Sequence, residues 1–231
     1  MIMLKKHILL MIIFIGINTQ IFALDVNQTV NEIIEYQQTV KSVKAYYTES
    51  TTVLGKKTSE NGVYYKKGNN VRKNVQYPIP KIIIITPEFY YEKCLDTGEE
   101  KKVAVNVNQY EDLNLPINNF DPLEMLKKTQ YTLDKETSDE LSVKTNIKET
   151  ILTLDFNKTK KNLKKIQINV KGGLISFVIT NEYAESDLFP SKTTMIGKIK
   201  AGSLNYTIES VSSFRRIEIN PEIQDSQFLI K

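Results

Sequence analysis

The stretch Asn61–Tyr91, which reads NGVYYKKGNNVRKNVQYPIPKIIIITPEFYY, decides the predicted fold. Turn residues separate short apolar or aromatic runs within it, and the last run continues a few residues further. The runs are Val63–Lys67, Val71–Tyr77, Ile82–Thr86 and Phe89–Leu95. Runs spaced at roughly ten residues are typical of an antiparallel sheet that curls toward a sandwich or barrel. The stretch therefore predicts a mainly β fold, and it leaves open what the sheet encloses.

The N-terminus has the order of a secretory signal peptide. Lys5 and Lys6 precede an apolar run over residues 8–17, and Ala23 offers a small residue for cleavage. The run is shorter than the roughly 20 residues that a membrane-spanning helix needs. We expect residues 1–23 to be removed and residues 24–231 to form one domain. An uncleaved N-terminal anchor is the alternative interpretation.

Composition excludes several kinds of chemistry. The single histidine, His7, lies in the predicted signal, so the processed chain would lack Ser-His-Asp and Cys-His catalysis and His-ligated zinc. The single cysteine, Cys94, cannot form an intrachain disulfide. A small net charge with few arginines argues against a nucleic-acid partner. We therefore expect no catalytic residue, no metal and no cofactor, and we interpret the paired acids Glu99-Glu100 and Asp139-Glu140 as solvated turns.

The rest of the chain predicts one amphipathic helix, further strands and a short helix. Helical spacing of apolar residues favours a helix over Leu24–Lys44. Asp121-Pro122 begins a short apolar helix that carries Leu123 and Leu126, placed as a flap over a sheet. The further predicted strands are Tyr46–Leu54, Lys101–Val107, Glu140–Asn146, Thr150–Phe156, Leu163–Val170, Leu174–Asn181, Leu204–Val211 and a last short strand over residues 227–230. Gly55–Gly62 is predicted to be a polar loop, and the total is about ten or eleven strands.

Alternation within the opening stretch predicts one face rich in apolar side chains. Its members are Val63, Tyr65, Val71, Val75, Ile83, Ile85, Phe89 and Tyr91. A sheet with such a face needs a cover, and the two predicted helices could supply it. Periodicity does not separate a filled core from an apolar cavity, so both interpretations stay open.

The order of these segments resembles the LolA family of periplasmic outer-membrane lipoprotein carrier proteins. A signal and an amphipathic helix precede a Gly-aromatic strand with the basic pair Lys66-Lys67 and a strand that ends at Pro78. The segment Asn162–Val170, followed by Gly172-Gly173, resembles the strand and hairpin of that family. The ending Asp225-Ser-Gln-Phe228 also resembles the family. The ordered set covers the predicted mature chain.

This resemblance implies a fold and a function. The fold would be an unclosed antiparallel β-barrel, covered by the N-terminal helix and a short lid helix over an apolar cavity. The eight apolar residues above would line the cavity, and Leu123 and Leu126 would belong to the lid. The protein would be a periplasmic monomer that takes lipoprotein acyl chains from an inner-membrane release complex to an outer-membrane receptor.

One position departs from the family pattern. A strand-borne Arg-Pro pair in the family hydrogen-bonds the lid, whereas this chain has Lys67-Gly68. Lysine can donate to carbonyls but lacks the planar fork of arginine. Lys67 is thus a candidate latch, and an ordinary solvated lysine is the alternative.

Two further functions stay open from the sequence. The same fold could serve as a lipid- or peptide-sensing module that binds a protein partner. A secreted enzyme using carboxylates or lysine is the third hypothesis, and the absence of histidine after residue 7 argues against it.

Overall fold

The computed structural model describes residues 28–104, 130–147, 150–160, 162–171, 175–184, 188–201 and 204–230. The predicted signal, the predicted lid residues Leu123 and Leu126 and the turn at Gly172-Gly173 lie outside these ranges. The chain divides into two compact units, Met1–Gln38 and Thr39–Lys231. Each unit is described by itself.

The described part of the first unit contains a helix over residues 28–37. Val30, Ile33 and Ile34 are fully buried, which confirms these three members of the predicted apolar stripe. Its other face is polar, with a 3.0 Å hydrogen bond from Gln28 to Glu32 one turn later. The predicted extension of this helix to Lys44 is wrong, because the chain joins a β-ladder from Ser42 onward.

The second unit is a β-sheet with a short 3-10 helix, η1 (Asp225–Phe228). Its strands are β1 (Ser42–Val53), β2 (Lys56–Lys67), β3 (Asn70–Tyr77), β4 (Lys81–Ile85), β5 (Phe89–Cys94), β6 (Glu100–Ala104), β7 (Thr132–Glu136), β8 (Glu140–Ile147), β9 (Thr150–Asn157), β10 (Asn162–Lys171), β11 (Ile175–Glu182), β12 (Lys192–Ala201) and β13 (Leu204–Ile219).

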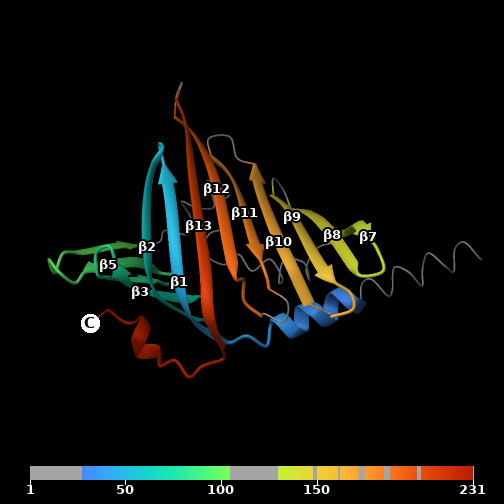
Figure 1. Cartoon of the computed structure of the whole chain (residues 1–231), viewed down its shortest axis with the longest axis horizontal. Coiled ribbons are helices and arrows are strands. Elements are labelled where there is room, and N and C mark those ends of the chain that lie inside the picture. The colour runs from blue at the N-terminus through green and yellow to red at the C-terminus, as the bar shows by residue number, and fades with distance from the viewer. Residues whose placement is uncertain are drawn as a thin grey trace, which may run out of the picture. The chain divides into compact units, whose positions relative to one another are not determined.

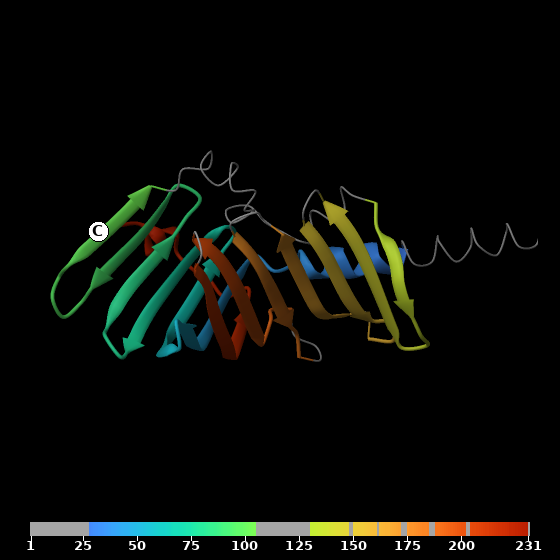
Figure 2. The ribbon, with the colours of Figure 1, turned by 90° about the horizontal axis from the view of Figure 1, so that it is seen from above.

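All of these strands form one antiparallel sheet (Figure 1). Its order is β6-β5-β4-β3-β2-β1-β13-β12-β11-β10-β9-β8-β7, with β1 and β13 at the centre. Consecutive strands are hydrogen-bonded neighbours except for β6 and β7, which are the two edge strands, and β1 pairs with β13. The sheet is strongly twisted, so the strands at its two ends lean in opposite directions in Figure 2. No ladder joins β6 to β7 among the described residues, which confirms the predicted mainly β, unclosed fold.

Three details of the strand prediction are wrong. The described residues form 13 strands, two of which (β7 and β12) were not predicted. The predicted loop Gly55–Gly62 is mostly β2, because its polar residues pair with β1 through main-chain hydrogen bonds that need no apolar alternation. The predicted last strand over residues 227–230 is wrong, because residues 225–228 form η1. Edge and polar strands escape a pattern search based on apolar alternation.

Pairing registers define two faces of the sheet, because residues directly opposite each other in an antiparallel pair project from the same side. Tyr64, Lys73, Ile83 and Glu92 stand opposite one another across β2 to β5, and we name their side the network face. The adjacent row forms the other side, which we name the tail face. That row is Tyr65, Arg72, Ile84 and Tyr91.

The network face continues across the whole sheet. A second row of opposite residues joins Glu49 in β1 to the strands at the far end. Its members are Glu49, Ser212, Thr193, Asn181, Ile166, Leu154 and Val143. The apolar core lies on this face over β8 to β10, where its residues are at most 3% exposed. They are Leu141, Val143, Leu152, Leu154, Phe156, Ile166, Ile168 and Val170.

Candidate functional site

The eight predicted cavity residues do not share one face. Alternation within each strand is as predicted, but the registers place half of the set on each side of the sheet. Val71, Val75, Ile83 and Ile85 lie on the network face. Val63, Tyr65, Phe89 and Tyr91 lie on the tail face. The prediction of one shared face is therefore wrong, and the assignment of the first four to a cavity stays a prediction.

Half-buried apolar side chains lie on the network face beside the closed core. Ile168 in the core stands opposite Ile179 of β11, which in turn stands opposite Met195 of β12. Phe177 lies two residues before Ile179 on the same side of β11, opposite Val170. Unlike the core residues, Phe177, Ile179 and Met195 are only half-buried. They form the part of this face best placed to contact an apolar ligand.

An aromatic cluster on the network face joins β2 to β13. The rings of Tyr64 and Phe214 lie 5.3 Å apart between centroids, and both contact Phe189 at 5.7 and 5.1 Å. Two of the three contacts are edge-to-face, the arrangement that aromatic quadrupoles favour. Burial raises the pKa of the Tyr64 hydroxyl above its ordinary value. These rings extend the apolar character of the face across the central strands.

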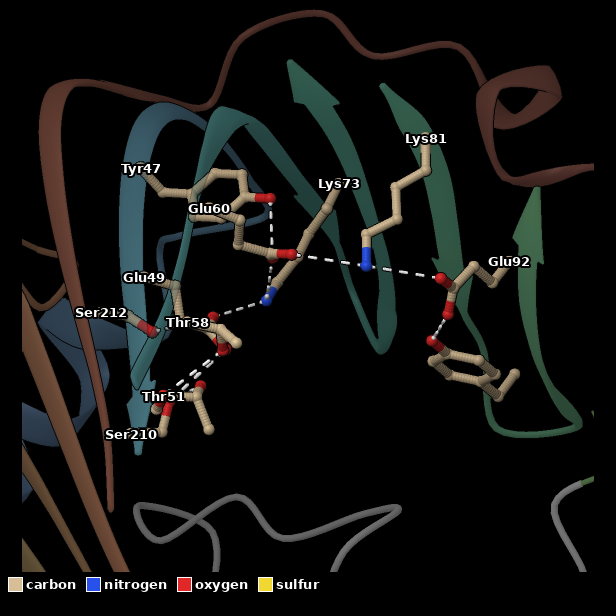
Figure 3. A network of polar contacts seen from close by, with 11 residues as sticks. Tyr47, Glu49, Thr51, Thr58, Glu60, Lys73, Lys81, Glu92, Ser210 and Ser212 are labelled. Carbon is tan, nitrogen blue, oxygen red and sulfur yellow. Dashed lines mark hydrogen bonds and ion pairs between the residues drawn. The ribbon is translucent and has the colours of Figure 1, made fainter. Parts of the chain in front are cut away.

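A ladder of alternating charges occupies the other half of the network face (Figure 3). Lys73 lies 2.7 Å from Glu49 and 3.8 Å from Glu60, and Lys81 bridges Glu60 at 3.5 Å to Glu92 at 3.3 Å. These side chains are between 19% and 32% exposed, so water screens the ion pairs only in part. Three carboxylates and two ammonium groups thus stand where the predicted cavity wall was expected to be apolar.

Hydroxyl groups complete the charge ladder. Ser212 donates to Glu49 at 3.1 Å and Tyr47 donates to Glu60 at 3.1 Å. Burial alone would raise the pKa of Glu49, but Lys73 and the serine hydroxyls outweigh it and hold that pKa below its ordinary value. The hydrogen bond from Tyr90 is the main cause of a lowered pKa at Glu92. Glu49 and Glu92 are therefore ionised and held in place at neutral pH.

The candidate latch Lys67 contacts the C-terminal segment (residues 221–230). Its ammonium donates to the carbonyl of Ile223 at 2.9 Å and lies 2.7 Å from Asp225. Arg72 donates to the carbonyl of Gln227 at 2.7 Å. The alternative interpretation of Lys67 as an ordinary solvated lysine is therefore wrong. The predicted lid residues lie outside the described ranges, so a contact between Lys67 and the lid stays a prediction.

Apolar contacts hold the same segment on the tail face. Ile223 and Phe228 are 5% and 4% exposed and pack in one cluster with Ile84 and Tyr91. Tyr65, Ile82, Phe89 and Ile230 pack against this cluster. Three of the predicted cavity residues (Tyr65, Phe89 and Tyr91) thus pack in the cluster that holds the C-terminal segment.

The sequence did not predict the charge ladder or the tail-face residues that pack against the C-terminal segment. Glu49, Glu60, Lys73 and Lys81 are far apart in the sequence and lie in strands whose polar residues alternate with others, so each resembles a solvated position. The available signal was a set of acids and lysines spread over neighbouring segments of the chain, one of which (Glu60) lies in the predicted loop. That signal becomes usable only once the register between strands is known.

The described residues contain no cluster of three His, Cys, Asp or Glu that could hold a metal. Among the helices of the described ranges, none is both long and apolar enough to cross a bilayer.

Comparison with known proteins identifies the fold. No protein-family model and no curated protein matches the sequence. Among solved structures, a LolA superfamily protein of Nitrosomonas europaea matches at a TM-score of 0.50 and 12% identity, over 89% of this chain and 97% of that one. A DUF1329 family protein of Desulfovibrio piger matches at a TM-score of 0.53 and 10% identity, over 89% of this chain and 96% of that one. An outer membrane lipoprotein-sorting protein domain of Vibrio parahaemolyticus matches at 0.49 and 9% identity, over 88% and 97%. The chain therefore has a LolA-like fold.

Proposed function

We propose that this protein is a periplasmic carrier that binds the acyl chains of lipoproteins and moves them from the inner to the outer membrane. The observation that supports it best is the network face, where half-buried apolar residues adjoin a closed apolar core in a LolA-like fold. Val71, Val75, Ile83 and Ile85 would extend the binding surface. Leu123 and Leu126 would cover it.

Binding by burial alone suits a carrier. Each methylene removed from water stabilises the complex by roughly 0.8 kcal/mol, so about ten methylenes would contribute about 8 kcal/mol before ordering costs. A membrane offers a similar gain, so the exchange between membrane and carrier is nearly balanced. Small differences between an open and a closed state can then set its direction. The proposed mechanism needs no catalytic residue and no cofactor, but it needs a donor complex and an acceptor at the two membranes.

The test is to purify the processed protein from its host and to identify bound molecules by mass spectrometry. Uptake of a fluorescent fatty acid by delipidated protein gives a second measurement. Ile179→Lys should reduce uptake at least tenfold, because it places a charge among the half-buried apolar residues of the network face. Ile196→Lys is the matched control, since Ile196 lies on the tail face and is 39% exposed.

Repeated absence of lipid and lipoprotein, together with no uptake of the probe, would overturn the proposal. A protein partner that stays bound after delipidation, with no acylated ligand, would instead support the lipid- or peptide-sensing module.

A further inference from the structure

A pocket of about 400 Å³ lies between the tail face and the C-terminal segment, within the second unit. Strands β3 to β5 form its floor, and η1 with the residues directly before and after it forms its roof. Its lining residues are Arg72, Ile82, Ile84, Tyr91, Lys93, Leu95, Gln224, Ser226, Gln227 and Leu229. It is on the opposite side of the sheet from the surface proposed to bind acyl chains.

The pocket is positively charged. Among the described residues, its lining contains two cations and no carboxylate. Lys93 is paired with Glu100 at 2.6 Å outside the lining, whereas Arg72 forms no ion pair with any acid in the described ranges. Arg72 therefore contributes the uncompensated charge of the pocket.

The guanidinium of Arg72 has more N–H donors than the two hydrogen bonds below use. Its Nε donates to Asn74 at 2.7 Å, and one terminal nitrogen donates to the carbonyl of Gln227 at 2.7 Å. Arginine has five N–H donors in a planar fork that suits carboxylate and phosphate oxygens. Burial lowers the pKa of Arg72, which reflects the cost of keeping its charge away from water. An anion beside it would offset that cost.

Apolar side chains form half of the lining, beside the polar residues Gln224, Ser226 and Gln227 of the roof. Ile82, Ile84 and Tyr91 form the floor, and Leu229 overhangs it from the C-terminal segment. Leu95 and Leu229 are 52% and 62% exposed at the rim, so the apolar surface continues to the opening. Pockets of roughly 300–1,000 Å³ with apolar walls and a few fixed polar groups are the usual form of small-molecule sites.

We propose that this pocket binds an anionic amphiphile with a single aliphatic chain. The carboxylate or phosphate head would accept hydrogen bonds from Arg72, and the chain would lie between Ile84 and Leu229. The site is independent of the network face, so the protein would hold two ligands on opposite sides of its sheet.

The test measures binding of decyl phosphate, decanoate, decyltrimethylammonium and inorganic phosphate to the processed, delipidated protein by calorimetry below micellar concentrations. Decyl phosphate or decanoate should bind at least tenfold more tightly than decyltrimethylammonium. Decyl phosphate should also bind at least tenfold more tightly than inorganic phosphate. Comparing decyl phosphate with decanoate separates a phosphate from a carboxylate head.

Variants locate the site. Arg72→Gln should remove the preference for the anionic probes, Arg72→Lys should keep part of it, and Arg215→Gln, an exposed arginine outside the pocket, should change nothing. Leu229→Ser should weaken binding of decyl phosphate and decanoate severalfold, while Leu133→Ser, at an exposed leucine of β7, should not. Lys67→Gln should loosen the C-terminal segment, which forms the roof of the pocket, while keeping Arg72. Comparing it with Arg72→Gln distinguishes the effect of the missing charge from the effect of a loosened roof.

Equal binding of anionic and cationic probes would overturn this proposal, as would decyl phosphate binding that Arg72→Gln leaves intact. Failure of the carrier proposal is a separate outcome. Ile179→Lys should abolish retained acylated ligand yet leave decyl phosphate binding unchanged, and Arg72→Gln should do the reverse.

Discussion

Lys67 at the end of β2 donates a 2.9 Å hydrogen bond to the main-chain carbonyl of Ile223, 156 residues further along the chain. The bond is to backbone, so it does not depend on which side chain residue 223 carries. It lies beside the buried side chains of Ile223 and Phe228. The basic residue that the sequence marks as a latch thus holds the C-terminal segment against the tail face.

Lys67→Gln should therefore loosen this segment while the sheet stays folded. Loss of a partly exposed charged hydrogen bond should cost about 1 kcal/mol of local stability. Hydrogen exchange of residues 221–230 should accelerate severalfold, measured by mass spectrometry. Asp225→Asn is the control, because Asp225 is 86% exposed and its ion pair with Lys67 is screened by water. Equal acceleration in both variants would show that the ion pair, and not the carbonyl bond, holds the segment.

Phe228→Ala should destabilise the protein more than any change at the neighbouring exposed Leu229. Phe228 is 4% exposed and packs with Ile84 and Tyr91. Truncating a buried phenylalanine leaves a cavity and costs about 3 kcal/mol. Urea denaturation measures the change, and Leu229→Ala at 62% exposure is the matched control. A Phe228→Ala midpoint equal to that of Leu229→Ala would mean that the cluster contributes nothing to global stability.

Gly62→Ala should prevent normal pairing of β2 with β3. A Cβ at Gly62 would lie 2.1 Å from the main-chain oxygen of Asn74, next to the register shift between Asn61 and Gly62. Rigid backbone must move to relieve that clash, so we expect a loss of about 3 kcal/mol or failure to fold. Gly197→Ala is the control, because its Cβ would meet nothing closer than 3.9 Å. Thermal unfolding compares the two variants, and a stable Gly62→Ala protein would contradict the close approach.

Glu49 should make stability depend on pH in the acid range. Its pKa in the folded protein lies below the ordinary value of 4.5, because Lys73 and two serine hydroxyls outweigh the effect of burial. The unfolded state therefore binds more protons in the window between the two pKa values. The stabilisation is complete above the unfolded pKa and is lost as pH falls through the folded pKa.

Urea unfolding at several values between about pH 3 and pH 7 measures this effect. The free energy of unfolding of the wild type should fall on acidification below about pH 4.5. Glu49→Gln should be less stable at neutral pH and should show a shallower fall. Glu92, whose pKa is also lowered, should contribute to the dependence that remains. An identical slope in wild type and Glu49→Gln would show that Glu49 is not held by the charge ladder.

Much of the fold follows from local sequence. β-branched and aromatic runs located most strands to within a few residues, from Val71–Tyr77 to Leu163–Val170. The buried stripe of Val30, Ile33 and Ile34 was readable from helical spacing. β7 and β12 were not, because exposed or Lys/Thr-rich strands are held by main-chain pairing with their neighbours.

The candidate site was less accessible. Alternation correctly placed Val71 with Val75, and Phe89 with Tyr91, on one side of their own strands. The pairing register between neighbouring strands, which decides whether their side chains share a face, could not be read from the local sequence. A shift of one residue in a turn moves a whole strand's side chains to the other face, so the two pairs lie on opposite sides of the sheet.

The sequence by itself determined a mainly β domain, an amphipathic N-terminal helix and the absence of histidine from the chain after residue 7. These properties depend on composition and on contacts between near neighbours. Only the tertiary structure decided that Lys67 holds the C-terminal segment and that Glu49, Glu60 and Glu92 share one face with two lysines. Those contacts depend on strand register and on residues distant in the chain, and cross-strand geometry sets them.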